Sequence, residues 1–203
     1  MCGIAGYLGR KALSQNVLES CLSLMHRRGP DSADFYANVD SRGNRVYMLS
    51  SRLNIIDLDD RANQPYRIDS EIIVFNGELY NYVELRNALL KKGIEFRTNS
   101  DTEVLLNILR THGLDALQQC EGMWAFAKYD ESTEELTLCR DRFGEKPLYM
   151  FDDGTGIYFG SEVKFIAKLQ GDRLPINYDH LHRYMVNGYK SIYRTGETFF
   201  DGV

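Results

Sequence analysis

The sequence predicts an α+β domain in which antiparallel sheets are covered by helices. Short hydrophobic stretches of strand length occur in pairs joined by polar turns, which is typical of antiparallel meanders. Stretches with helical spacing fall between these pairs rather than alternating regularly with single strands. The chain has 203 residues, of which 43% are hydrophobic and 26% charged, so it can form a substantial core.

The first part of the chain supplies strands around a few helices. Strand patterns occupy residues 3–8, 35–39, 45–53 and 71–75, and helical spacing occupies residues 17–25 and 80–92. The turn Asp40-Ser41-Arg42-Gly43-Asn44 joins the second and third of these strands. Residues 54–67 have weak periodicity, which predicts a long packed or functional loop.

The second part begins with a helix start signal. Ser100-Asp101-Thr102-Glu103 matches the S-x-x-E capping box, and the helix it opens is expected to end near Gly113. Two hairpins are predicted, one from residues 122–129 and 135–140 and the other from residues 148–151 and 157–160. Helices at residues 162–169 and 178–186 complete the elements.

Composition excludes several classes of function. The formal net charge is -5 and no basic stripe occurs, which argues against a nucleic-acid partner. The longest apolar runs have the length of a strand, so no membrane span is expected. No secretory signal is recognisable, and the cysteines form no C-x-x-C pair. We therefore expect free thiols in a cytoplasmic protein.

The opening "MCGIAGYLG" places Cys2 directly behind the initiator methionine. A lipid-attachment cysteine needs a preceding signal, and only Met1 stands before it. A phosphate loop is a poor match, because the glycines lack the G-x-G-x-x-G spacing and no strand precedes them. A buried structural thiol and a nucleophile at a free N-terminus both remain open on position alone.

The nucleophile hypothesis has a chemical basis. Methionine aminopeptidases remove Met1 when a small residue such as cysteine follows. Cys2 would then carry both a thiol, with a pKa of about 8.5, and an α-amine, with a pKa of about 7.7–8.0. An amine that titrates near neutrality can accept the thiol proton, so one residue would supply the nucleophile and its base.

Asn76-Gly77 is a candidate pair of hydrogen-bond donors. The dipeptide is normally a hairpin signal, but the residues that follow have helical rather than strand spacing. We therefore expect it at a junction between a strand and a helix. A side-chain amide and an unhindered backbone N–H at one point could stabilise an oxyanion.

Arg52 and Asp101 each allow two interpretations. Arg52 is either a surface arginine or a bidentate clamp for a carboxylate. Asp101 is either an acidic residue that complements a helix dipole or a carboxylate that holds an ammonium group. Together the two side chains would bind the α-groups of an amino acid and leave its side chain to Cys2.

The order of the motifs resembles a known family. The co-linear set is "MCGIAGYLG", "RRGPDS", "SRLNIIDL", "QPY", "VFNGELYNYVELR", "SDTEVLL", "GMWAFAKYD", "CRDRFGEKPLY" and "FGSEVKFI". It is similar to the glutaminase domain of class II glutamine amidotransferases, specifically the asparagine synthetase family, over nearly the whole chain. The resemblance implies an N-terminal-nucleophile hydrolase fold, a four-layer α/β/β/α sandwich of two antiparallel sheets.

The resemblance also implies roles for the candidate residues. Cys2 would become the first residue, attack the side-chain amide of L-glutamine and release ammonia. Asn76 and Gly77 would form the oxyanion hole, Arg52 would bind the substrate α-carboxylate and Asp101 its α-ammonium group. The remaining predicted pocket residues are Leu53, Asn54, Ile55, Ile56 and Glu78. The last two motifs of the set resemble framework, with packing and interdomain signalling as equal alternatives.

The family comparison also divides the chain. Residues 1–190 correspond to the glutaminase domain and residues 191–203 to the start of a linker into an ATP-dependent synthetase domain. The Ser-Gly-Gly-rich loop of that domain does not occur in the sequence. We therefore expect no metal or cofactor for the glutaminase half-reaction, with ATP and Mg required only by the synthetase domain. Expected partners are L-glutamine and that domain or subunit. A truncated chain, a free-standing subunit and a homodimer are left open, as is the ammonia acceptor.

One departure from the family pattern stands in the loop after the first helix. The family reads His-Arg-Gly-Pro-Asp where this chain has Arg27 before Arg28-Gly29-Pro30-Asp31, with His26 one position early. The loop shape is expected to survive, but any role of the family histidine is in doubt. The alternative function is a catalytically silent glutaminase-like scaffold for a synthetase partner.

Overall fold

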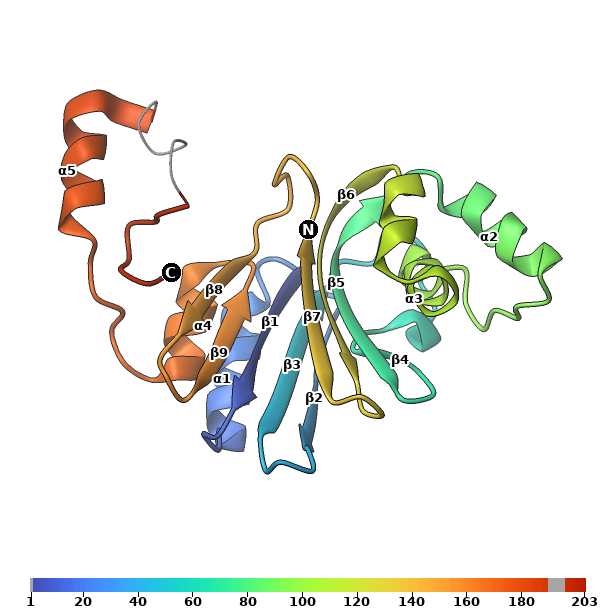
Figure 1. The fold of residues 1–203 in the computed structure, drawn as a ribbon, viewed down its shortest axis with the longest axis horizontal. Coiled ribbons are helices and arrows are strands. Elements are labelled where there is room, and N and C mark those ends of the chain that lie inside the picture. The colour runs from blue at the N-terminus through green and yellow to red at the C-terminus, as the bar shows by residue number, and fades with distance from the viewer. Residues whose placement is uncertain (1, 190–195) are drawn as a thin grey trace.

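The computed structural model describes residues 2–189 and 196–203, which form two stacked antiparallel sheets with helices on both outer faces (Figure 1). Sheet A has the strand order β2-β3-β1-β9-β8, and sheet B has the order β4-β5-β6-β7. The strands are β1 Gly3–Gly9, β2 Ser32–Val39, β3 Arg45–Arg52, β4 Tyr66–Ile68, β5 Glu71–Leu79, β6 Gly122–Asp130, β7 Glu135–Arg140, β8 Tyr149–Asp152 and β9 Gly156–Gly160.

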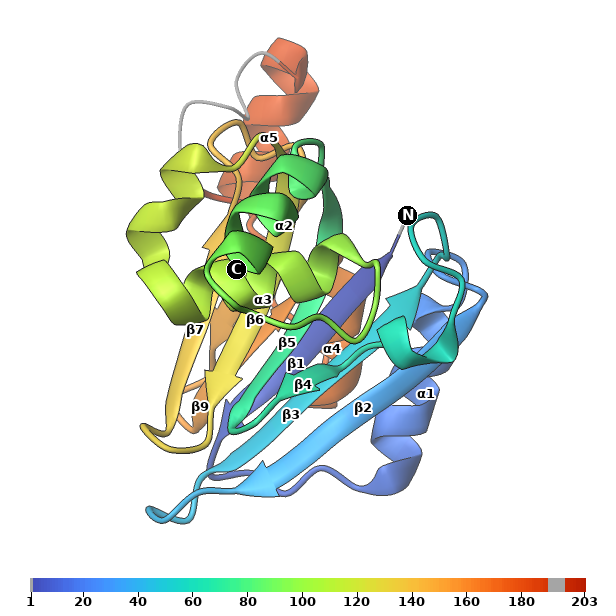
Figure 2. The ribbon, with the colours of Figure 1, turned by 90° about the vertical axis from the view of Figure 1, so that its right-hand side faces the viewer.

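Helices cover the two sheets from opposite sides. They are α1 Gln15–Met25, α2 Tyr82–Lys91, α3 Asp101–His112, α4 Val163–Gln170 and α5 Tyr178–Asn187, with short 3-10 helices η1 Asp60–Ala62 and η2 Leu114–Gln119. Helices α1 and α4 pack on sheet A, while α2 and α3 cover sheet B and lie in front of it in Figure 2. The predicted four-layer α/β/β/α sandwich is therefore confirmed.

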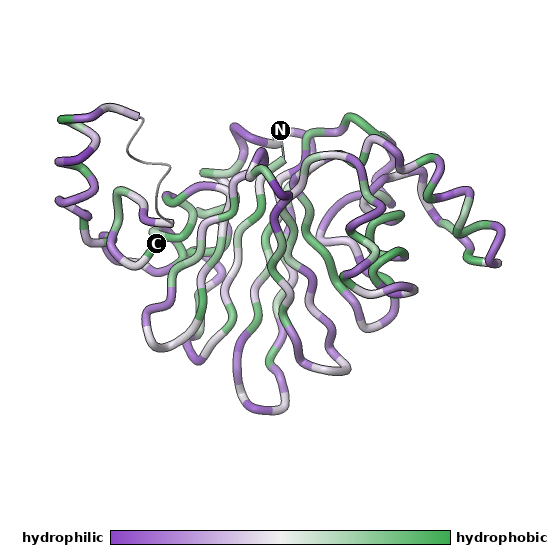
Figure 3. The backbone as a smooth tube through the Cα atoms, turned by 45° about the horizontal axis from the view of Figure 1, so that its top comes forward, coloured by the Kyte–Doolittle hydropathy of each residue, from purple (hydrophilic) through white to green (hydrophobic). Residues whose placement is uncertain are grey.

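Strand alternation builds three hydrophobic cores. On β5, Ile72 and Val74 face sheet A, whereas Ile73 and Phe75 face the helices. A central sandwich strand is buried on both faces, which explains why this stretch reads as a continuous apolar run. In Figure 3, hydrophobic residues recur along the strands, whereas the hairpin turns are mostly hydrophilic.

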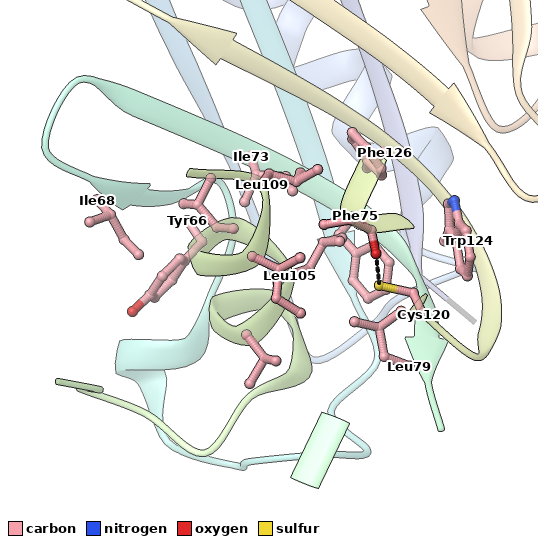
Figure 4. Packing of buried hydrophobic residues seen from close by; sticks show 14 of the residues in the cluster. Tyr66, Ile68, Ile73, Phe75, Leu79, Leu105, Leu109, Cys120, Trp124 and Phe126 are labelled. Atoms are coloured by element: carbon pink, nitrogen blue, oxygen red, sulfur yellow. Dashed lines mark hydrogen bonds between the residues drawn. The ribbon is translucent and has the colours of Figure 1, made fainter. Parts of the chain in front are cut away.

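Helix α3 is anchored on sheet B by large side chains. Leu105 and Leu109 of the helix belong to the same buried cluster as Phe75 and Leu79 of β5 and Trp124 of β6 (Figure 4). Full burial of one such side chain contributes about 1.5–3 kcal/mol. This packing fixes the first turn of α3 against the end of β5.

The predicted junction at Asn76-Gly77 is wrong. Strand β5 continues to Leu79, and α2 begins only at Tyr82, because β5 pairs with β6 as far as Leu79 opposite Gly122. The pair therefore lies inside a strand, and no hairpin turn forms there. Because β5 continues past Gly77, the N–H of Gly77 points to an edge of the strand.

Other predicted boundaries shift for the same reason. Strand β2 begins at Ser32 rather than residue 35, since its polar first residues pair with the end of β3. The loop predicted at residues 54–67 contains η1 and the first residues of β4, which is too short to give a period-two pattern. The polar turn at residues 40–44 is confirmed, with the Asp40 carboxylate accepting from the N–H groups of Arg42 and Asn44.

The capping box forms only in part. Ser100 Oγ accepts from the Thr102 N–H at 3.1 Å, as predicted for an N-cap. Glu103 does not reach back to the Ser100 N–H, because its carboxylate accepts from the N–H groups of Arg97 and Thr98 at 2.9 and 2.7 Å. The buried Glu103 thus holds the loop that leads into α3.

The cysteines form no disulfide in the described part of the chain. Cys2, Cys21, Cys120 and Cys139 are all free thiols, as predicted.

Helix α5 stands away from the two sheets (Figure 1), and Ile176 before it forms a β-bridge with Phe200. No helix in residues 2–189 and 196–203 is long and apolar enough to cross a bilayer. The predicted domain boundary between residues 190 and 191 lies outside the described residues and stays a prediction.

Candidate active site

Three strands bring their polar ends together at one end of the sandwich. Cys2 directly precedes β1, Arg52 ends β3, and Asn76 lies near the end of β5. Antiparallel pairing of Gly3 with Ser51 sets Cys2 beside the end of β3. Each of the three side chains lies on the same strand face as a residue of the core between the sheets, namely Ile4, Met48 and Val74. Cys2, Arg52 and Asn76 therefore extend that core at its polar end.

A cavity of about 100 Å³ opens at this end. Its volume suits a small molecule such as one amino acid, since pockets for drug-sized ligands reach about 300–1,000 Å³. All but one of the predicted site residues line it: Cys2, Arg52, Leu53, Ile55, Ile56, Asn76, Gly77, Glu78 and Asp101. Asn54 is not among the lining residues. Its N–H instead donates to Asp31 Oδ2 at 2.8 Å, so the lining gives its predicted binding role no support.

The Cys2 thiol is held but not ionised by its surroundings. The Leu53 N–H donates to Cys2 Sγ at 3.4 Å. Burial raises the pKa of the Cys2 thiol, and the Leu53 hydrogen bond and the charge of Arg52 only partly oppose this rise. The thiol is therefore neutral near pH 7, and a reaction at this sulfur needs a base to take its proton. Met1, whose removal would expose the α-amine of Cys2, lies outside the described residues.

Gly77 offers a backbone donor to the cavity. The N–H groups of a strand alternate between its two edges, so those of Phe75, Gly77 and Leu79 point to the same edge of β5. Two of them are taken by side chains: Gln64 Oε1 accepts from Phe75 at 2.6 Å and Asp101 Oδ2 accepts from Leu79 at 3.1 Å. β4 pairs with β5 only as far as Ile73, so the N–H of Gly77 points into the cavity beyond the end of that ladder.

Only glycine fits at position 77. A Cβ there would lie 2.4 Å from the Met123 carbonyl oxygen and within 2.8 Å of the Phe75 ring. The absence of a side chain keeps β5 and β6 in register and leaves the backbone N–H uncovered. Asn76, by contrast, turns its side chain between the sheets and is 1% exposed. Its Nδ2 donates to Ser161 Oγ at 3.4 Å, which leaves the second N–H of the amide for the cavity.

Arg52 is 4% exposed, so it is not a surface arginine. Its guanidinium donates to Asn63 Oδ1 at 3.0 Å, to the Ile56 carbonyl at 2.9 Å and to the Asp57 carbonyl. Guanidinium carries five N–H donors, so two remain after these three bonds within the described part of the chain. The loop after β3 therefore fixes a cation whose remaining donors can bind an anion.

Asp101 is a buried anion at the first turn of α3. Burial raises the pKa of Asp101 to about 6, although hydrogen bonds from the Leu79 and Thr102 N–H groups oppose the rise. The charge of Asp101 raises the pKa of the Cys2 thiol, while that of Arg52 lowers it. The cavity thus presents a cation and an anion beside one thiol, an arrangement that matches the two α-groups of an amino acid.

Several lining residues were not predicted: Gln64, Phe75, Ser100, Thr102, Met123 and Lys146. Gln64 joins the two sheets and α3. Its amide oxygen accepts from the Phe75 N–H on β5 and from Ser50 Oγ on β3 at 3.4 Å, and its Nε2 donates to Thr102 Oγ1 at 3.2 Å. Lys146 is 5% exposed, and its N–H donates to Asp141 Oδ2 at 3.0 Å. Both lie in motifs that resemble the family, which was the signal available for them. The described residues contain no group of three or more His, Cys, Asp or Glu side chains that could hold a metal ion.

The loop after α1 carries the departure at Arg27 on its exposed side. His26 and Arg27 are both exposed, whereas Arg28 turns inward and donates from Nε to the Cys2 carbonyl at 2.9 Å. Gly29 lies against the end of β3, where a Cβ would approach the Ser51 carbonyl to 2.4 Å. The expectation that this loop keeps the family's shape stays a prediction.

Comparison with known proteins shows which family the chain is similar to. A family model described as "Glutamine amidotransferase domain" matches residues 1–203. An asparagine synthetase (glutamine-hydrolysing) of Bacillus subtilis is 36% identical over 91% of the chain, and a putative one of Methanocaldococcus jannaschii is 32% identical over 93%. The chain spans 29% and 40% of the lengths of these two relatives.

Solved structures show the same fold. The glutamine phosphoribosylpyrophosphate amidotransferase of B. subtilis, in complex with ADP and GMP, matches 83% of the chain with a TM-score of 0.69 at 20% identity, and the matched part is 44% of that chain. The allosteric regulatory enzyme of purine biosynthesis matches with a TM-score of 0.67 at 18% identity. The chain therefore belongs to the glutamine amidotransferase domain family, with the N-terminal-nucleophile hydrolase fold, and is homologous to the glutaminase part of glutamine-hydrolysing asparagine synthetases.

Proposed function

We propose that this domain hydrolyses the side-chain amide of L-glutamine to glutamate and ammonia. The observation that carries the proposal is the cavity at the end of the sandwich, where one thiol, two oxyanion donors and two opposite charges converge. Arg52 binds the substrate α-carboxylate and Asp101 its α-ammonium group. The side chain of glutamine then extends toward Cys2, with its carbonyl oxygen between the Asn76 amide and the Gly77 N–H.

The proposed reaction uses Cys2 twice. Removal of Met1 exposes the α-amine, which takes the thiol proton as the sulfur attacks the amide carbon. Asn76 and Gly77 stabilise the resulting oxyanion, and the protonated α-amine then donates its proton to the departing nitrogen, which leaves as ammonia. Water, deprotonated by the same amine, cleaves the thioester at Cys2, which releases glutamate and restores the thiol. The raised pKa of the buried thiol supports this need for a base.

The use of the ammonia is proposed from the relatives. They are named glutamine-hydrolysing asparagine synthetases and are much longer than the matched part. We propose that an ATP-dependent synthetase domain or subunit accepts the ammonia for asparagine synthesis or a related amidation. ATP and Mg would serve that partner, while the glutaminase step uses the side chains of this domain alone. A cytoplasmic location is proposed from the four free thiols, and a homodimer stays a prediction.

The test measures glutamate and ammonia released from L-glutamine by this chain as a function of pH. Equimolar products near pH 7.5 are expected, and a chain that releases neither would overturn the proposal. The KM for glutamine is expected to be about tenfold higher at pH 5 than at pH 7, because Asp101, with its pKa of about 6, becomes neutral below that pH and loses its attraction for the substrate ammonium.

The control for the pH effect is Asp101→Asn, which removes the titrating group and keeps its size. This variant is expected to bind glutamine weakly at both pH values, with a KM that no longer changes between them. If the native chain hydrolyses glutamine with the same KM at pH 5 and pH 7, Asp101 does not bind the substrate ammonium, and the proposed hydrolysis itself still stands.

A further inference from the structure

Ser161 connects the two sheets at the end that holds the cavity. It directly follows β9 and is fully buried. Phe159, two residues earlier, belongs to the core between the sheets, so strand alternation turns the Ser161 side chain toward sheet B as well. Ser161 does not line the cavity, and the proposed mechanism gives it no role.

The hydroxyl of Ser161 receives hydrogen bonds from both sheets. Its Oγ accepts from the Ile4 N–H at 3.1 Å and from Asn76 Nδ2 at 3.4 Å, while its own N–H donates to the Ile4 carbonyl at 2.9 Å. Ile4 is two residues from Cys2. The strand that begins at the thiol and the strand that carries the Asn76 amide are therefore tied to one oxygen atom.

The neighbouring residue anchors the same turn to Cys2. Glu162 Oε1 pairs with Arg28 NH1 at 3.1 Å, and Arg28 Nε donates to the Cys2 carbonyl at 2.9 Å. The turn at residues 161–162 is thus linked to the main chain of Cys2 through Glu162 and Arg28, and it contacts the Asn76 amide through Ser161. Its position relative to both groups is fixed at two points.

We propose that Ser161 is a positioning residue that aims the Asn76 amide at the oxyanion formed on glutamine. A carboxamide NH2 group is planar, so a hydrogen bond from one N–H to Ser161 also sets the direction of the other. Without that acceptor the amide can rotate, and its free N–H points at the oxyanion for only part of the time. This inference rests on the proposed glutamine hydrolysis and adds a residue of the "FGSEVKFI" motif to it.

The test compares Ser161→Ala with Ser51→Ala, a serine that is equally buried but donates to the Met25 carbonyl instead. Loss of an oxyanion donor itself lowers kcat by about 10²–10³-fold, so its misdirection in Ser161→Ala is expected to lower kcat by about tenfold. The KM for glutamine should change by less than about twofold, because Ser161 does not contact the groups that bind the α-carboxylate and α-ammonium. Ser51→Ala is expected to retain the native kcat.

A double-mutant cycle separates positioning from general stability. Rates are divided by the concentration of active sites, titrated with the diazoketone analogue of glutamine, so that unfolded protein does not lower kcat. If Ser161 acts through Asn76, adding Ser161→Ala to an Asn76→Ala chain should leave kcat unchanged. An equal loss of kcat with and without Asn76 would overturn the positioning role.

The outcomes also distinguish this role from the proposed function. A native chain that hydrolyses glutamine, together with a Ser161→Ala chain of native kcat, would overturn the positioning role alone. A native chain that leaves glutamine intact would overturn the proposed function and this role with it.

Discussion

Replacing Cys2 with alanine is expected to lower the rate of glutamine hydrolysis by about 10⁴-fold or more, because removal of the nucleophile leaves only binding and oxyanion stabilisation. Cys2 carries the only thiol among the lining residues of the cavity. Met123 also lines the cavity, but its thioether cannot form a thioester. The measurement is the release of glutamate and ammonia by the native and Cys2→Ala chains, after equal melting temperatures have shown that both are folded. The substrate KM cannot be compared if turnover disappears, so glutamine binding is followed by calorimetry and should persist.

The matched control is Cys139→Ala, which removes a half-buried thiol on β7 that does not line the cavity. It is expected to retain native activity. A Cys2→Ala chain that stays within about tenfold of the native rate would show that another group attacks the amide. That group would belong either to another residue of this chain or to a contaminating glutaminase, and the second case would leave this chain as the silent scaffold.

Replacing Asn76 with alanine is expected to lower kcat by about 10²–10³-fold, the usual loss when one oxyanion-hole donor is removed. The KM for glutamine should change little, because the α-groups of the substrate are bound by Arg52 and Asp101. The Gly77 N–H would remain as the second donor and account for residual activity. Steady-state kinetics at saturating and limiting glutamine separates the two parameters.

Asn107→Ala serves as the control for this variant. Asn107 is also buried, but it lies on α3 and donates to the Glu103 carbonyl at 3.1 Å, outside the cavity. We expect a native kcat for Asn107→Ala even if its melting temperature falls. A higher KM with native kcat in Asn76→Ala would contradict the oxyanion role and make Asn76 a substrate-binding residue instead.

The elements of the fold could be predicted where the hydrophobic pattern of a short stretch determines them. Alternating or continuous apolar runs predicted β1, β3, β6 and β7, and the helical spacing after Asn81 predicted α2. The end of β5 was not readable, because Asn76 to Leu79 become a strand through pairing with β6, some 45 residues away in the chain. A three-residue strand such as β4 gives no periodic signal and depends on its partner in the same way.

The site was readable where a residue type implies its chemistry. A cysteine at position 2 and the pair of charges at Arg52 and Asp101 suggested a nucleophilic thiol and a clamp for the two α-groups of an amino acid. Local sequence could not decide whether Arg52 is exposed, since its burial follows from the loop that wraps its guanidinium. The same limit applies to Gln64 and Ser161, whose side chains act on strands distant in the chain.

The most direct test of the account is the reaction of this chain with the diazoketone analogue of glutamine, followed by mass spectrometry. The reagent presents an electrophilic carbon where glutamine has its amide, so a thiol at the end of the amino-acid clamp should displace nitrogen and form a stable thioether. We expect one label per chain, on Cys2 of a chain that has lost Met1, and protection by excess glutamine. A label on Cys21, Cys120 or Cys139, or a label on Cys2 in a chain that retains Met1, would contradict it.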